Sequence, residues 1–193
     1  DGLHMLVKKI TSLVSTFDVA CASFLSAVLR VIDRLLVTFA NEDRMRNLVE
    51  TALFDSLRII LQDFEKYPGE IQSHCIAIIS AFIHNEPTSL SILQERKVPQ
   101  AMIDAVCRGV PVDGDVISGL LLAFGASCLN SEGEQYFKSH DPLKTLLSVF
   151  LDPKYSRILI QHGNASIIGQ SMDEFIRHHP ALGQMCIDEM MVM

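Results

Sequence analysis

Two apolar stretches of equal length decide the fold: GEIQSHCIAIISAFIHN at residues 69–85 and GDVISGLLLAFGASCLN at residues 114–130. Both begin with Gly at a turn, both end with Asn, and their first residues are 45 positions apart. Neither stretch alternates polar and apolar residues as a half-buried strand would, so each is predicted to be a helix.

The similarity extends over two complete blocks, residues 41–85 and 86–130, which align without a gap. Leu48 aligns with Leu93, for example, and the turn before residue 69 aligns with the turn before residue 114. Each block is predicted to hold a short helix, a middle helix, a turn and a long apolar helix. A third block, residues 131–180, repeats this order with a few extra residues; its predicted helices are 132–139, 142–151 and, after an irregular stretch, 165–178.

A repeat of about 45 residues with three helices per unit is typical of armadillo and HEAT proteins. One such unit cannot cover its own apolar face, whereas stacked units share a core. The prediction is therefore an all-α armadillo/HEAT-like solenoid in a single segment, residues 1–193. It consists of three units between leading helices in residues 1–40, at about 3–15 and 18–40, and a truncated last helix in residues 181–193. The alternative is an irregular helical bundle in which the match between blocks is accidental.

Several helix ends are marked by residues with a known mechanism. Pro87, Pro142 and Pro153 suit the first position of a helix, where a missing N–H costs nothing. Ser131 and Glu134 fit a capping box, and Asp115 is a good N-cap for the apolar run that follows it.

Composition excludes several classes of protein. With 193 residues, of which 49% are hydrophobic, the chain is large enough to form a core without disulfides or metals. The net charge of −7 argues against a nucleic-acid surface, which needs clustered Lys and Arg. No apolar run approaches the roughly 20 residues of a membrane span, so neither a membrane nor a nucleic acid is expected as a partner.

The cysteines favour a reducing compartment. They are odd in number, widely spaced and embedded in apolar runs, as small buried side chains would be: Cys21, Cys75, Cys107, Cys128 and Cys186. The cytoplasm and/or the nucleus is the expected location.

No catalytic, cofactor-binding or metal-binding residue is predicted. His162, His178, His179 and Cys186 are the nearest approach to a zinc site, but adjacent histidines point to different sides of a helix, and His-His-Pro fits a solvated turn. His74 and Cys75 suggest a base beside a nucleophile, yet neighbours in a helix do not face each other. An enzyme on an unfamiliar helical fold remains a rival hypothesis for which the sequence supplies no candidate residues.

Two sets of residues are candidates for contacts with other proteins. Asn85 and Asn130 end equivalent long helices, and in armadillo solenoids asparagines on the third helices hold the backbone of a bound peptide. The alternative is that each Asn simply ends its helix in the left-handed conformation. The last helix is too apolar to face water and is expected to dock on neighbouring solenoid segments of the same chain, through Met185, Met190, Met191 and Met193.

Four stretches together resemble one protein family. They are EPTSLSILQE at 86–95, GDVIS from residue 114, CLNSEG at 128–133 with the downstream Phe137 and Asp141-Pro142, and MDEFIRHHP at 172–180. In order and spacing, roughly residues 30–193 resemble the conserved helical domain in the N-terminal half of the very large HECT-type ubiquitin ligases, the Mule-like enzymes of animals with their fungal and plant relatives.

The resemblance implies that the parent chain is an E3 ubiquitin ligase whose catalytic cysteine lies in a distant C-terminal HECT domain. None of the five cysteines here is therefore assigned the thioester role. The expected function is that of a non-catalytic scaffold that recruits protein substrates or adaptors. The sequence departs from the family around residues 154–169, where relatives have a longer, more basic linker and this chain offers only Lys154 and Arg157.

The main rival is a free-standing armadillo adaptor with no ligase attached. Such a module needs polar capping helices at both ends. The chain begins without Met and its end helices are apolar, so both ends are expected to be cuts through a longer protein.

Overall fold

The structure, a computed structural model, describes residues 2–38 and 47–192, and every regular element in these ranges is a helix. The all-α prediction is confirmed. The α-helices are α1 (Gly2–Ser15), α2 (Ala22–Thr38), α4 (Leu53–Gln62), α5 (Gly69–Asn85), α6 (Leu90–Glu95), α7 (Val98–Arg108), α8 (Gly114–Ser127), α9 (Ser131–His140), α10 (Pro142–Ser148), α11 (Pro153–Ile160), α12 (Asn164–His178) and α13 (Pro180–Val192); the 3-10 turns are η1 (Val19–Cys21), η2 (Pro87–Ser89) and η3 (Gln161–Gly163).

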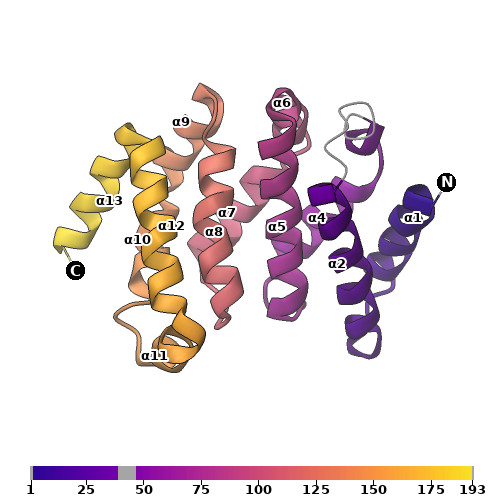
Figure 1. The fold of residues 1–193 in the computed structure, drawn as a ribbon, viewed down its shortest axis with the longest axis horizontal. Coiled ribbons are helices and arrows are strands. Elements are labelled where there is room, and N and C mark those ends of the chain that lie inside the picture. The colour runs from indigo at the N-terminus through magenta and orange to yellow at the C-terminus, as the bar shows by residue number, and fades with distance from the viewer. Residues whose placement is uncertain (1, 39–46, 193) are drawn as a thin grey trace.

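The long helices form two layers of a solenoid. In one layer α2, α5, α8 and α12 stand side by side, and each contacts the next (Figure 1). In the other layer α1 contacts α4, α4 contacts α7 and α7 contacts α10, while the short helices α6 and α9 pack against α7. The N- and C-termini lie at opposite ends of the array (Figure 1).

Hydrogen bonds repeat at the spacing of the units. The Arg96 guanidinium donates to the Thr51 carbonyl oxygen at 2.9 Å, and the Tyr155 hydroxyl donates to the Val110 carbonyl oxygen at 2.5 Å; both pairs are 45 residues apart in sequence. The Arg108 guanidinium reaches the Gln62 carbonyl oxygen at 2.8 Å across 46 residues. These bonds join a helix or loop to its counterpart in the adjacent unit, as expected of a stacked repeat.

A single apolar core runs the length of the array, from Val7 to Cys186. Aromatic pairs connect its layers: Phe54 of α4 lies 4.6 Å from Phe82 of α5 between ring centroids, and Phe137 of α9 lies 5.1 Å from Phe124 of α8. Large fully buried side chains of this kind are the main favourable term in folding.

Glycines at the starts of α5 and α8, the third helices of two successive units, permit close stacking. A Cβ on Gly69 would lie 2.4 Å from Oδ2 of Asp113, and a Cβ on Gly114 would lie 2.1 Å from Nδ2 of Asn164. Asp113 is the N-cap of α8, and Asn164 is the first residue of α12. In both places the bare glycine backbone therefore leaves room for a polar side chain at the start of the next third helix.

Two predicted caps are wrong by one or two residues. Asp113, rather than Asp115, caps α8, and its carboxylate accepts from the Asp115 and Val116 amides. Asn130, rather than Ser131, caps α9. In each case the true cap has extended backbone, which directs its side chain at the free amides, whereas the predicted residue is already helical.

One helix lies where an irregular stretch was predicted. α11 follows the helix-start signal at Asp152-Pro153, whose carboxylate accepts from the Lys154 amide, and lies at one edge of the array (Figure 1). The predicted divisions at 40/41, 85/86, 130/131 and 180/181 remain predictions, and the first lies in residues 39–46, outside the described ranges.

In residues 2–38 and 47–192, no single helix is both long and apolar enough to cross a membrane. The pair formed by α5 and residues 87–95 meets the criteria of length and composition together, but it is bent by 113°.

Candidate functional site: a groove along the third helices

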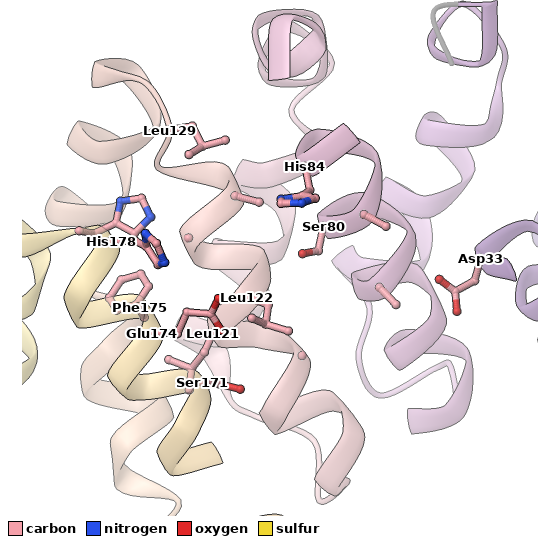
Figure 2. Close-up of a pocket in the computed structure, with 16 residues that line it drawn as sticks. Asp33, Ser80, His84, Leu121, Leu122, Leu129, Ser171, Glu174, Phe175 and His178 are labelled. Carbon is pink, nitrogen blue, oxygen red and sulfur yellow. The ribbon is translucent and has the colours of Figure 1, made fainter. Parts of the chain in front are cut away.

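A groove of about 650 Å³ opens on the layer formed by α2, α5, α8 and α12 (Figure 2). Its lining therefore comes from third helices of successive units. The lining residues are Asp33, Ala77, Ser80, Ala81, His84, Gly119, Leu121, Leu122, Gly125, Ala126, Leu129, Ser171, Glu174, Phe175, His178 and His179.

Small residues on two neighbouring helices line much of the groove. Ala77 and Ala81 of α5 and Gly119, Gly125 and Ala126 of α8 are all half-buried. Without long side chains at these positions, the backbone of a bound chain can come close to the helices.

Two exposed leucines stand over this surface. Leu122 is 47% exposed and Leu129 is 53% exposed, and both line the groove. Exposed large apolar side chains beside a concave surface are typical of sites that bind another protein.

Polar side chains surround the apolar lining. Asp33 of α2 lies on one side, Glu174 and His178 of α12 lie on the opposite side, and His84 of α5 lies between them (Figure 2). Burial raises the pKa of the Asp33 carboxyl, while His74 and Arg34 act to lower it.

His179 is the partly buried member of the adjacent histidine pair. Burial lowers the pKa of its imidazole, and the neighbouring His178 lowers it further. Its ring packs against Phe175, with centroids 5.4 Å apart. His179 therefore favours the neutral form and contributes apolar surface to the groove.

Asn85, a predicted partner-binding residue, ends α5 and is exposed. Its Nδ2 lies 3.5 Å from the Leu36 carbonyl oxygen of α2, so the side chain spans the ends of two third helices. It lies next to His84 in sequence but does not line the groove.

Asn130, the second predicted partner-binding residue, lies in the connection from α8 to α9. Its Oδ1 accepts from the Gly133 amide and from Gln94 Nε2, both at 2.9 Å, and its Nδ2 donates to Gln94 Oε1 at 2.8 Å. Neither asparagine has the left-handed backbone considered for it. Partner binding by these residues stays a prediction.

The predicted docking methionines lie on α13. Met185 packs partly buried against the core, whereas Met190 is 44% and Met191 is 82% exposed. Met193 lies outside the described residues.

All five cysteines are free thiols. Cys75, Cys128 and Cys186 are buried, as predicted for small core residues, while Cys21 and Cys107 are partly buried. Burial raises the pKa of Cys128 to about 12 and that of Cys186 to about 11. Within residues 2–38 and 47–192, no group of three or more His, Cys, Asp or Glu is placed to hold a metal ion.

The groove residues themselves were not predicted. Leu122 and Leu129 belong to an apolar helix in which they could not be distinguished from core positions without knowing its neighbours. One signal was available: small residues recur on the α5 and α8 sequences, at Ala77, Ala81, Gly119 and Gly125.

Comparison with known proteins agrees with the resemblance found in the sequence. The profile of the family described as Domain of Unknown Function (DUF913) matches residues 8–193. E3 ubiquitin-protein ligase ptr1 of Schizosaccharomyces pombe is 37% identical over 158 residues, which cover 82% of this chain and 5% of the relative.

Two further relatives carry similar names. E3 ubiquitin-protein ligase HUWE1 of Mus musculus is 28% identical over 169 residues, covering 83% of this chain and 4% of the relative. E3 ubiquitin-protein ligase TOM1 of Saccharomyces cerevisiae is 27% identical over 160 residues, covering 83% of this chain and 5% of the relative.

The chain thus spans only a small part of the length of these relatives. Because the family profile covers nearly the whole sequence, and the relatives named above are E3 ubiquitin-protein ligases, the chain belongs to the DUF913 family of helical domains found in such ligases.

Proposed function

We propose that this chain is a non-catalytic scaffold segment of a very large HECT-type E3 ubiquitin-protein ligase, in which it recruits protein substrates or adaptors. The groove along the third helices carries the proposal, because it combines a concave apolar surface with exposed leucines. Binding a substrate here would raise its effective concentration near a distant catalytic cysteine.

The state of the cysteines supports the non-catalytic role. A thioester-forming cysteine acts as a thiolate, which requires a lowered pKa and access to solvent. Burial instead raises the pKa of Cys75, Cys107, Cys128 and Cys186. These thiols also fit a reducing environment, so we place the protein in the cytoplasm and/or the nucleus.

The test uses the full-length parent protein with Leu122→Glu and Leu129→Glu together. We expect ubiquitination of a subset of substrates to fall, while transfer of ubiquitin from the conjugating enzyme to the ligase stays unchanged. Val112→Glu is the matched control, since Val112 is 51% exposed and lies outside the groove. Loss of the thioester in the groove variant, or discharge of a conjugating enzyme by the 193-residue chain alone, would refute the scaffold role.

We also propose that α13 docks on the neighbouring solenoid segment of the parent chain. Its exposed Met190 and Met191, with Ile187 and Val192, form an apolar surface that would otherwise face water. Oxidative footprinting checks this: Met191 should be oxidised readily in the 193-residue chain and protected in the full-length protein. Equal oxidation in both would show that nothing covers α13.

A role in partner binding for Asn85 and Asn130 is retained as part of the proposal. Asn85 is the better placed of the two, because it is exposed beside the groove residue His84. Asn85→Ala is expected to weaken substrate capture less than the leucine variants do, since it removes hydrogen bonds at the edge of the groove only.

A further inference from the structure

The ionised side chains of the groove are distributed unevenly. Its two carboxylates stand on opposite sides, Asp33 on α2 and Glu174 on α12 (Figure 2). No Lys or Arg occurs among the described residues that line the groove. A bound chain would therefore meet a negative charge on each side and, between them, a mainly apolar surface that also carries His84.

Within residues 2–38 and 47–192, neither carboxylate forms an ion pair. Glu174 forms no ion pair there, because the nearby Arg177 pairs with Asp173 at 2.8 Å. Asp33 likewise forms no ion pair with a described residue, although Arg34 and His74 are close enough to act on its charge. Asp33 is half-buried and Glu174 is exposed; of the two, the half-buried carboxylate gains more from an incoming cation.

The spacing of the helices sets the length of segment that can reach both carboxylates. From α2 to α12 the layer has three steps, α2 to α5, α5 to α8 and α8 to α12. Packed helices lie about 8–10 Å apart, so the two sides are roughly 27 Å apart. An extended chain covers that distance in about eight or nine residues, and an α-helix needs about eighteen.

The width of the two conformations favours the extended chain. A helix is about 10–12 Å wide with its side chains, whereas an extended backbone needs only about 4.8 Å, the spacing of neighbouring strands. In an extended chain only alternate side chains face the groove, and the small residues Ala81, Gly119 and Ala126 leave room for its backbone.

We propose that the groove binds an extended protein segment of about nine residues that has aliphatic side chains at its centre and a Lys or Arg at each end. The cations pair with Asp33 and Glu174, and the aliphatic side chains contact Leu122 and Leu129. The proposal rests on the proposed function, since it specifies which segments of substrates or adaptors the groove selects.

Binding of labelled synthetic peptides to the 193-residue chain tests the proposal by fluorescence anisotropy. The probe is a capped peptide of about nine residues with Lys at both ends and alternating Leu and Ala between them; its counterpart has Glu at both ends. We expect the Lys-ended peptide to bind more tightly, and Asp33→Asn with Glu174→Gln to weaken it about tenfold. The same variant should reduce the difference between the two peptides.

Glu70→Gln and Asp173→Asn provide the matched control. Both residues are exposed carboxylates on third helices, both lie outside the groove, and they pair with Arg30 and Arg177 respectively. The control variant should bind the Lys-ended peptide as the unmodified chain does.

Each other outcome overturns the proposal in a distinct way. Equal binding of both peptides, abolished by Leu122→Glu, would retain the groove and refute the selection of basic ends. Tighter binding of a helical peptide of about eighteen residues with Lys at both ends would refute the extended occupant. Failure of every peptide to bind would refute this inference, while the proposed function would still be decided by the substrate assay in the full-length protein.

Discussion

The middle of the solenoid and its C-terminal part are similarly apolar but differ in how completely they are packed. In the middle, α5 has a third helix on each side, and residues such as Ile76, Ile79 and Phe82 are fully buried. In the C-terminal part, most residues of α13 are apolar as well, yet its buried residues are Leu182, Gly183 and Cys186. Burial in a repeat protein thus depends on the neighbours of a helix as much as on its composition.

The largest difference should appear when one aromatic ring is removed from each part. Phe82→Ala leaves a closed cavity beside Phe54 and should lower the free energy of unfolding by about 3–5 kcal/mol. Phe175→Ala should cost less, about 2 kcal/mol, because Phe175 lines the groove and water can fill the space. Urea unfolding followed by circular dichroism measures both. Equal losses would mean that the two parts are packed alike.

Two glycines extend the comparison from side chains to the backbone. A Cβ on Gly133 would lie 1.9 Å from the Ser127 carbonyl oxygen, so Gly133→Ala must separate α9 from α8. We expect it to destabilise the protein by about 1–3 kcal/mol. Gly169 of α12 has no atom within 4 Å of its Cβ position, and Gly169→Ala should stabilise the helix by about 0.5–1 kcal/mol. The melting temperature should therefore fall for Gly133→Ala and rise for Gly169→Ala, and shifts in the same direction would contradict this comparison.

Removing the hydrogen bond that joins Tyr155 of α11 to the preceding unit should have a moderate effect on stability. The buried Tyr155 hydroxyl donates to Val110, so Tyr155→Phe leaves that carbonyl without its partner and should cost about 1–2 kcal/mol. Tyr136→Phe serves as the comparison, since its hydroxyl bonds the Asp104 carboxylate in a less buried place. If Tyr136→Phe costs more in chemical unfolding, α11 adds little to the stacking of the units.

A smaller effect should distinguish the starts of successive middle helices. Lys97, before α7, has a left-handed backbone with φ of 60°, whereas Ala52, 45 residues earlier and before α4, has φ of −74°. Glycine relieves strain only in the left-handed case. Lys97→Gly should therefore stabilise the protein by about 0.5 kcal/mol and Ala52→Gly should destabilise it by a similar amount. Two changes of the same sign in the melting temperature would contradict this explanation.

The smallest expected effect is on the way the free energy of unfolding changes with pH. Burial lowers the pKa of His74 in α5 and of His179 after α12, so on acidification the unfolded chain takes up protons before the folded one does. The stability that each contributes is present above the ordinary pKa of histidine, near 6.5, and is lost as the pH falls below it. His74→Gln and His179→Gln should each flatten the fall of unfolding free energy between neutral and mildly acidic pH. An unchanged slope would show that the imidazole concerned is protonated equally in both states.

The fold was predictable because turn residues and apolar runs recur at the period of the repeat. Gly69 and Gly114 begin matching helices, and the apolar runs that follow them contain no competing pattern. The helix α11 was missed even though the Asp152-Pro153 start was noted, because the two preceding units offered only a turn at that position. The repeat pattern therefore predicts the helices that all units have in common, but not a helix such as α11 that occurs in one unit.

The site was less predictable for a related reason. Whether Leu122 lies in the core or in the groove depends on how far α8 is rotated against α5 and α12, which is set by contacts between units. Asn130 shows the same limit: its amide is bonded to Gln94, 36 residues away, a pairing that no local pattern predicts. Packing between units therefore decides which of several similar residues face a partner.

The glycines at the starts of α5 and α8 also have a mechanical consequence. Each lets successive third helices come close together at one edge of the stack, because it has no side chain where Asp113 or Asn164 lies. A larger residue at Gly69 or Gly114 would push the start of its helix away from the next third helix at that edge. The two helices would then tilt against each other, and the bend of the solenoid would change at that step. In any longer array of such units, this change of angle would displace distant parts far more than it would disturb the core around the glycine.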